Sequence, residues 1–168
     1  MSKNLIMRIK PNIEDKRLTR KIFGFNELLK RTKLDVIEEK PLSLFLNDQE
    51  IVTMMTINDY PKYLALGYLL NQNMINSTTK IDKVEYYDDL MTVIVRTKKP
   101  VDYQKKLKKK TITSGCAQGT LFGDIMESFK KIKFKDTPKL KMSWIYELSK
   151  KINLMPSLYL KAGAIHGC

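Results

Sequence analysis

The residue with the clearest chemical potential is Cys116, which lies in the glycine-flanked segment Ser114 to Thr120 (SGCAQGT). Two glycines and small polar side chains predict a tight, uncrowded loop. Five lysines occupy the six positions from Lys105 to Lys110, and nearby cations favour a thiolate over a thiol. We expect Thr120 to cap a helix whose N-terminus would act in the same direction. Cys116 is therefore the candidate nucleophile.

The same loop could also cradle an anion. Backbone N–H groups at Ser114, Gly115 and Gly119 could form a nest, and Lys110 would add a positive charge. We assign a cofactor-binding role to these four residues. The alternative for Cys116 is an inert, buried thiol that packs as a small hydrophobe, and its polar neighbours speak against that.

His166 is the single histidine and lies in a second segment of small residues, 162–168. Imidazole titrates near neutral pH, so His166 could orient or deprotonate a sulfur species, although a histidine near a terminus is more often simply exposed. A zinc site built from Cys116, His166 and Cys168 would lack paired Cys-x-x-Cys spacing. We therefore predict no metal site.

Composition limits the classes of protein to consider. The chain has 168 residues, enough for one domain with a hydrophobic core, and a formal net charge of +13. Such a charge attracts polyanions, so nucleic acid, a phosphorylated cofactor and an acidic protein are candidate partners. The alternative is that scattered lysines only keep the surface soluble.

The expected location is the cytoplasm. No apolar run approaches the roughly 20 residues that cross a bilayer, and the charged start of the chain lacks the apolar core of a signal peptide. Two cysteines are too few for a disulfide scaffold, and a reducing compartment would keep both as thiols. No membrane partner is expected.

Periodicity predicts the elements that position these residues. Residues 1–33 are expected to form a basic N-terminal arm with a short helix over Phe25–Arg31, and residues 34–168 a single domain. Alternating Leu42, Leu44 and Leu46 predict a hairpin over 41–56, and a second hairpin spans 81–97. Between them, Asn58 or Asp59 should cap a helix that has Pro61 in its first turn and ends near 71–73.

The second half of the chain continues this alternation. A short strand is expected at 111–113, followed by a helix from Thr120 with an apolar face that includes Phe122. Another helix should begin at Thr137 and Pro138 and bury a stripe of apolar side chains. That stripe comprises Leu140, Trp144, Ile145, Leu148 and Ile152.

Four short motifs, in order, resemble those of the formate dehydrogenase accessory sulfurtransferases, the FdhD family. Residues 38–47 (EEKPLSLFLN) resemble its E-x-P-L-x-I-x-x-N hairpin, and residues 54–70 its threonine turn and L-A-x-G-F-L helix. Residues 113–119 (TSGCAQG) resemble its cysteine loop, and residues 163–166 (GAIH) its G-G-x-H element. Together the motifs cover residues 38–168.

The resemblance implies a fold and a function. The fold would be a cytidine-deaminase-like α/β sandwich with a mixed sheet, lacking the family's C-terminal part. Cys116 would accept a persulfide sulfur from a cysteine desulfurase and pass it to the molybdenum or tungsten cofactor of formate dehydrogenase. The substrate would be the bis-guanine-dinucleotide form of that cofactor, whose phosphates would give the lysine excess a purpose. Homodimerisation is a further expectation.

Three features differ from the family pattern. Gly119 stands where many members carry a second cysteine, and Asn71-Gln72-Asn73 replaces the usual S-E-G after the helix. Family proteins also continue past the G-G-x-H element into a segment containing R-H-N, so we expect this chain to be an amino-terminal portion.

Two rival functions follow from the residues. The charge, with interleaved residues such as Tyr86 and Tyr87, is compatible with a basic nucleic-acid-binding module, but no recognised motif supports it, and nucleic acid is not among the expected partners. A Cys/His hydrolase that uses Cys116 and His166 is the other rival.

Overall fold

The computed structural model describes residues 12–101, 103, 107, 110–111, 121–122 and 139–163. The chain forms two compact units. One, the hairpin unit, is drawn from Met1–Glu38 and Lys139–Cys168, and the other, the sheet unit, from Glu39–Pro138. The division between an arm of residues 1–33 and a domain of residues 34–168 stays a prediction.

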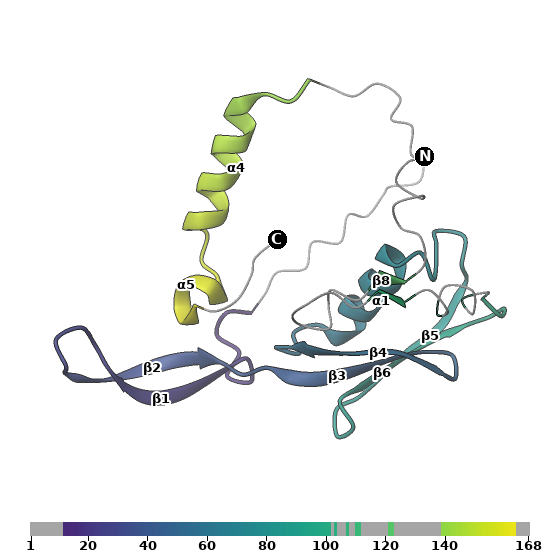
Figure 1. Ribbon diagram of the computed structural model, residues 1–168, viewed down its shortest axis with the longest axis horizontal. Coiled ribbons are helices and arrows are strands. Elements are labelled where there is room, and N and C mark those ends of the chain that lie inside the picture. Colours follow the sequence, from purple (N-terminus) through teal and green to yellow (C-terminus); the bar gives the residue numbers. More distant parts are fainter. Residues whose placement is uncertain are drawn as a thin grey trace. The chain divides into compact units, whose positions relative to one another are not determined.

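The sheet unit is built on a four-stranded mixed sheet (Figure 1). Its strands are β3 (Lys40–Leu46), β4 (Gln49–Thr56), β5 (Ile81–Tyr87) and β6 (Thr92–Thr97), in the order β4-β3-β6-β5. The outer pairs β3–β4 and β5–β6 are antiparallel, and the central pair β3–β6 is parallel. The predicted α/β class with a mixed sheet is therefore confirmed, while the likeness to cytidine deaminases stays a prediction.

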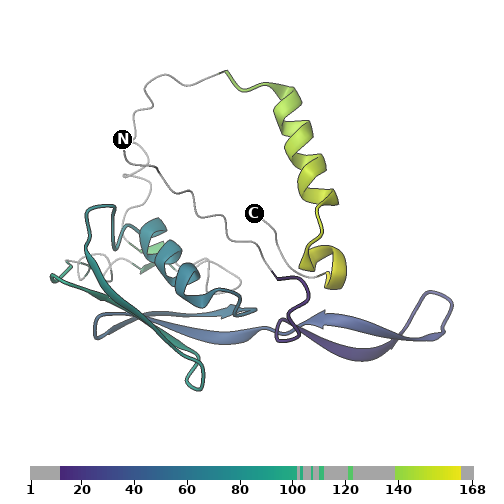
Figure 2. The same cartoon turned by 180° about the vertical axis from the view of Figure 1, so that it is seen from behind.

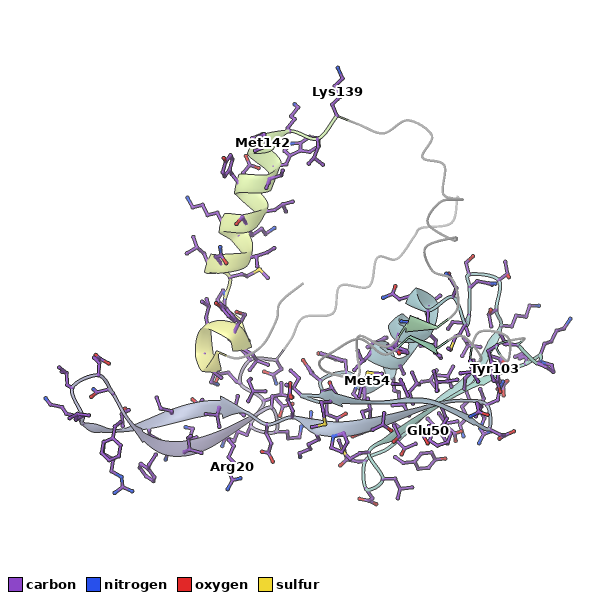
Figure 3. The ribbon with its side chains drawn as sticks, viewed as in Figure 1. Arg20, Glu50, Met54, Tyr103, Lys139 and Met142 are labelled. Atoms are coloured by element: carbon purple, nitrogen blue, oxygen red, sulfur yellow. The ribbon has the colours of Figure 1, made fainter. Side chains whose placement is uncertain are left out.

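The core of the sheet unit lies between this sheet and α1 (Pro61–Asn71), which covers one face of the sheet in both views (Figures 1 and 2). Leu42, Leu44 and Leu46 alternate along β3 and are fully buried, as the period of two requires. Ala65 and Leu69 of α1 pack onto them. Met54, labelled in Figure 3, belongs to the same core.

Both predicted hairpins of the sheet unit are confirmed, but the predicted cap of α1 is wrong. The N-cap is Tyr60 with a φ of 49°, and its side chain makes no capping bond. Asn58 is itself left-handed, with a φ of 59°, and its amide donates to the Tyr86 hydroxyl instead. Pro61 starts the helix as predicted. Proline is tolerated there because the N–H groups of the first helical turn have no partner within the helix.

Gly67 allows a test of how α1 packs, because a Cβ at that position would meet no atom within 4 Å. Glycine within a helix costs stability relative to alanine through its backbone freedom. We expect Gly67→Ala to raise the free energy of unfolding by about 0.5–1 kcal/mol, measured by urea denaturation.

Gly163 provides the matched control, since its φ of 64° and ψ of −168° lie in a region that is essentially restricted to glycine. The same change there, Gly163→Ala, should lower stability by about 1–3 kcal/mol. A loss of stability in Gly67→Ala would contradict the open space beside this face of α1.

The hairpin unit contains β1 (Thr19–Phe25) and β2 (Arg31–Ile37), which pair antiparallel. The predicted helix over Phe25–Arg31 is wrong, because these residues are the turn and its flanks. The Asn26 side-chain oxygen accepts from the backbone N–H of Leu28 at 3.1 Å and of Lys30 at 2.9 Å. A side chain that binds the backbone locally competes with the helix, and so short a helix is marginal in water.

The described part of the hairpin unit also contains two helices, α4 (Met142–Leu154) and α5 (Leu158–Ala162). The predicted helix is present, but it begins at Met142, since Lys141 has an extended backbone. Its predicted buried stripe is wrong: Trp144 is 42% exposed and Leu148 59%. Periodicity identifies an apolar face of a helix but not what covers it. None of the helices in the described ranges has the length and apolar character needed to span a bilayer.

Polar contacts connect Ile13 and Glu14, near the start of the described residues, to α5. The Lys161 ammonium donates to the backbone carbonyl of Ile13 at 2.9 Å and lies 3.2 Å from the Glu14 carboxylate. Leu18 and Leu158 are both buried in this unit. The N-terminal residues therefore help to hold the helix that directly precedes the predicted GAIH element.

Candidate functional site

The cysteine segment is bracketed by two short paired strands of the sheet unit. In β7 (Lys110–Thr111) and β8 (Leu121–Phe122), Lys110 lies opposite Phe122 and Thr111 opposite Leu121. Thr111 and Leu121, the described residues that flank the segment 112–120, are therefore neighbours across the two strands. The predicted strand at 111–113 is confirmed for Thr111.

This pairing corrects the expected start of the helix after the cysteine loop, while the remainder of that predicted helix, with Ile125, Met126, Phe129 and Ile132, lies outside the described residues. Phe122 was predicted on the apolar face of a helix opened by Thr120, but it lies in β8 with Leu121. Backbone pairing with β7 has overridden the helical spacing of the apolar side chains. No helix therefore begins at Leu121, and the features of the sequence that favour a reactive Cys116 are the nearby lysines and the composition of the loop.

Most predicted site residues lie outside the described residues, namely Ser114, Gly115, Cys116, Gly119, His166 and Cys168. For Lys110 the structure gives the backbone, in β7. Gly163 is the C-cap of α5 and the first residue of the GAIH element. Its backbone lies in a region that is essentially restricted to glycine, which explains why glycine stands at this position. The roles assigned to these residues stay predictions.

Asn47, the last residue of the hairpin motif, joins two strands at one end of the sheet. It has a left-handed φ of 55°, a conformation that asparagine tolerates. Its side-chain oxygen accepts from the Thr97 backbone N–H at 2.9 Å, and its side-chain amide donates to the Thr97 hydroxyl at 3.2 Å. The asparagine of the motif thus fixes the β3–β4 turn against β6.

An open cavity of about 690 Å³ lies beside Asn47. Its lining carries both signs of charge, including Asp48, Asp82, Arg96 and Lys98. Sequence reasoning missed this cavity, because charged residues on exposed strand positions are too common to signal a site. Its mixed lining favours neither an anionic nor a cationic ligand.

Glu85 is at the centre of an ion network on β5 and β6. The Lys83 ammonium lies 2.6 Å from one carboxylate oxygen of Glu85, and Nε of Arg96 lies 3.0 Å from the other. Hydrogen bonds from Lys83 and Arg96 lower the pKa of Glu85 to about 2 from its ordinary 4.5. The hydrogen bond to Glu85 raises the pKa of Lys83.

We therefore expect a pH-dependent contribution from Glu85. Because its folded pKa lies below its unfolded pKa, the contribution is fully present above about pH 4.5 and is lost as the pH falls toward 2. Replacing both partners, with Lys83→Gln and Arg96→Gln, should return the pKa of Glu85 toward 4.5. The carbon-13 shift of the Glu85 carboxylate, followed by NMR against pH, measures this.

Lys62→Gln is the control, since Lys62 is exposed on α1 outside the network and its loss removes one charge as well. It should leave the pKa of Glu85 near 2. If the Glu85 carboxylate of the unmodified chain titrates at 4.5, its ion network with Lys83 and Arg96 does not form in solution.

The second motif has a structural role as well. Thr56 is 8% exposed, and its hydroxyl accepts from the backbone N–H of Asn58 at 3.2 Å. This bond shapes the turn from β4 into α1.

In the parts of the chain that the structure describes, no cluster of three or more His, Cys, Asp or Glu side chains could hold a metal ion.

Comparison with known proteins gives one family. The family model described as the FdhD/NarQ family matches residues 37–168, which is most of the chain and includes Cys116 and His166. The β1–β2 hairpin falls almost entirely before the match.

Curated relatives carry a functional name. The chain is 26% identical over 136 residues to the sulfur carrier protein FdhD of Wolinella succinogenes, covering 78% of this chain and 46% of that one. With its namesake from Bacillus pumilus it shares 23% identity over 158 residues, covering 93% of this chain and 59% of the other. The chain thus spans about half the length of the curated relatives it matches.

Among solved structures, the chain resembles one described as a formate dehydrogenase accessory protein from Desulfotalea psychrophila. The TM-score is 0.42 at 19% identity, over 50% of this chain and 35% of that one. The family match over residues 37–168 covers the cysteine loop and the strands that bracket it. On this match, the chain belongs to the FdhD/NarQ family.

Proposed function

We propose that this chain is a sulfur carrier that uses Cys116 to move a persulfide sulfur from a cysteine desulfurase to the metal cofactor of formate dehydrogenase. The family match across Cys116 is the observation that carries the proposal. The names of the relatives support the sulfur-carrier role, and the name of the similar solved structure supports the link to formate dehydrogenase.

Loading is a thiol–persulfide exchange. The Cys116 thiolate attacks the outer sulfur of the donor's cysteine persulfide, the donor's S–S bond breaks, and a new S–S bond forms on Cys116. The donor cysteine leaves as a thiolate, so no oxidant is consumed. The rate depends on the ionised fraction of Cys116 and on access to it, and the lysines before the loop favour the first.

Delivery transfers the outer sulfur of the Cys116 persulfide to the molybdenum or tungsten of the acceptor, which is a substrate here. The Cys116 S–S bond breaks and Cys116 leaves as a thiolate. The transferred sulfur gains two electrons, which the reduced acceptor metal supplies as it is oxidised by the same number. The carrier therefore returns to its starting state.

The surrounding residues have supporting roles in this proposal. Backbone N–H groups at Ser114, Gly115 and Gly119, together with the Lys110 ammonium, would bind the phosphates of a bis-guanine-dinucleotide cofactor. His166 would orient or deprotonate the sulfur species. The pairing of Thr111 in β7 with Leu121 in β8, on either side of the segment 112–120, supports this picture. A reducing cytoplasm and a homodimer complete the proposal.

Intact-protein mass spectrometry tests the loading step. Incubation with a cysteine desulfurase, its pyridoxal phosphate and free cysteine should add the mass of one sulfur atom to the chain, and a thiol reductant should remove it. Peptide mapping should place the added sulfur on Cys116.

Cys168 gives an internal control, because it is the chain's second thiol. The Cys168→Ala variant should load as the unmodified chain does. Sulfur found on Cys168 alone, or an adduct that a reductant does not remove, would contradict the proposal. A stable acyl adduct on Cys116 with simple esters would favour a Cys/His hydrolase instead.

A further inference from the structure

The β1–β2 hairpin presents two aromatic and two basic side chains on the same face. In its register Phe23 lies opposite Lys33, and Phe25 opposite Arg31. Positions two apart on a strand share a face, about 7 Å apart, so all four residues lie together. Phe23 is 64% exposed and Phe25 70%. We call Phe23, Phe25, Arg31 and Lys33 the aromatic–basic patch.

Contacts within the patch hold its cations over an aromatic ring. The guanidinium carbon of Arg31 lies 4.3 Å from the centre of the Phe23 ring, and the Lys33 ammonium lies 6.0 Å from it. A stacked guanidinium keeps its N–H groups in its own plane, where they can meet an oxyanion. Among the described residues, no carboxylate forms an ion pair with either cation.

The surrounding charge favours a polyanion. Residues 16–33 contain seven Lys or Arg side chains and a single acidic one, Glu27. Asp35 is the nearest acid on the same face of β2, and it lies opposite Lys21 in the register. The negative charge of that face therefore lies at the base of the hairpin, beyond the patch.

We propose that the aromatic–basic patch binds single-stranded nucleic acid. Flat rings at alternate positions of an exposed strand are the arrangement on which RNA-binding sheets stack successive bases, while neighbouring cations contact the phosphates. Exposed phenylalanine rings add little to contact with a purely acidic peptide, whereas every base offers a face to stack on. The sequence contains no recognised nucleic-acid-binding motif. The strand register provides separate support, because it places two aromatic and two basic side chains on one face of the hairpin. The patch lies outside the family match, and the inference does not depend on the proposed sulfur carrier.

Fluorescence anisotropy with the full chain and a labelled oligothymidylate of about 12 nucleotides tests this surface. The oligonucleotide should bind, with an affinity that falls as salt rises. Phe25→Ala should weaken binding by about 5- to 150-fold, the range measured for loss of one base–aromatic stack. The double variant Arg31→Gln, Lys33→Gln should reduce the slope of log affinity against log salt by about 0.7 for each cation lost.

Variants on the opposite face of the same hairpin are the matched controls. Arg20 and Ile22 alternate with the patch residues, and Figure 3 labels Arg20. Arg20→Gln and Ile22→Ala should change the affinity by less than about twofold, since neither touches the bound strand. Circular dichroism of each variant establishes that the hairpin unit still folds.

Two outcomes would overturn the inference. Phe25→Leu keeps an apolar side chain but loses the flat ring, so full affinity in that variant would exclude base stacking. Equal affinity for a labelled polyglutamate peptide of the same length would identify the patch as a surface for acidic proteins instead.

Discussion

Replacing Cys116 by alanine should abolish activation of formate dehydrogenase by this chain. In the proposed mechanism the Cys116 sulfur is the only point of attachment for the transferred atom, and alanine cannot form the S–S bond. Cells that lack their own sulfur carrier for formate dehydrogenase, and that express this chain, provide the measurement through formate-dependent dye reduction. The unmodified chain should restore activity and Cys116→Ala should leave it at background.

Cys116→Ser sharpens this test, because a hydroxyl preserves the size and polarity of the thiol but cannot carry sulfur at neutral pH. It should be as inactive as the alanine variant, while Cys168→Ala should support activity. Activity in Cys116→Ala would exclude this residue as the carrier. If the unmodified chain loads sulfur in vitro but supports no activity in cells, delivery is the step that fails.

The largest effect on stability is expected from Leu44→Ala. Leu44 is fully buried on β3, a strand paired on both sides, with Val52 opposite it on β4 and Val93 on β6. Loss of a buried leucine removes its transfer free energy and leaves a cavity, at a cost of about 2–5 kcal/mol. Because domains of this size are stable by only about 5–15 kcal/mol, the sheet unit should be close to unfolding at 37 °C. Urea denaturation followed by circular dichroism measures the loss.

Leu90→Ala is the control for this change. Leu90 lies in the turn between β5 and β6 and is 71% exposed, so its truncation should shift stability by less than about 0.5 kcal/mol. If both variants unfold at the same urea concentration, β3 is not the centre of the core that the burial pattern indicates.

The sequence predicted the two hairpins of the four-stranded sheet and the body of α1 well, because local rules decide them. Strict alternation at Leu42, Leu44 and Leu46 matches the two-residue period of a strand with one buried face. Proline at position 61 fixed the start of α1 through its missing N–H. The mixed character of the sheet was predicted from the family resemblance, and the strand order β4-β3-β6-β5 was not predicted, since periodicity carries no information about which strands are neighbours.

In two of the failed predictions, contacts between residues decided the structure. The Asn26 side chain turned a predicted helix into a hairpin, and pairing with Lys110 placed Phe122 in a strand. Helical spacing in α4 predicted an apolar face correctly but not its exposure. The cysteine loop was recognised by residue type alone, and its geometry lies outside the described residues.

The connection between Lys161 and residues 13 and 14 has a consequence for biosynthesis. The hairpin unit is discontinuous in sequence, with the whole of the sheet unit inserted between its two parts. A ribosome makes residues 39–138 as one uninterrupted stretch, so the sheet unit can fold while translation continues. The amino-terminal segment must wait for α5 to emerge before Lys161 can reach Ile13 and Glu14.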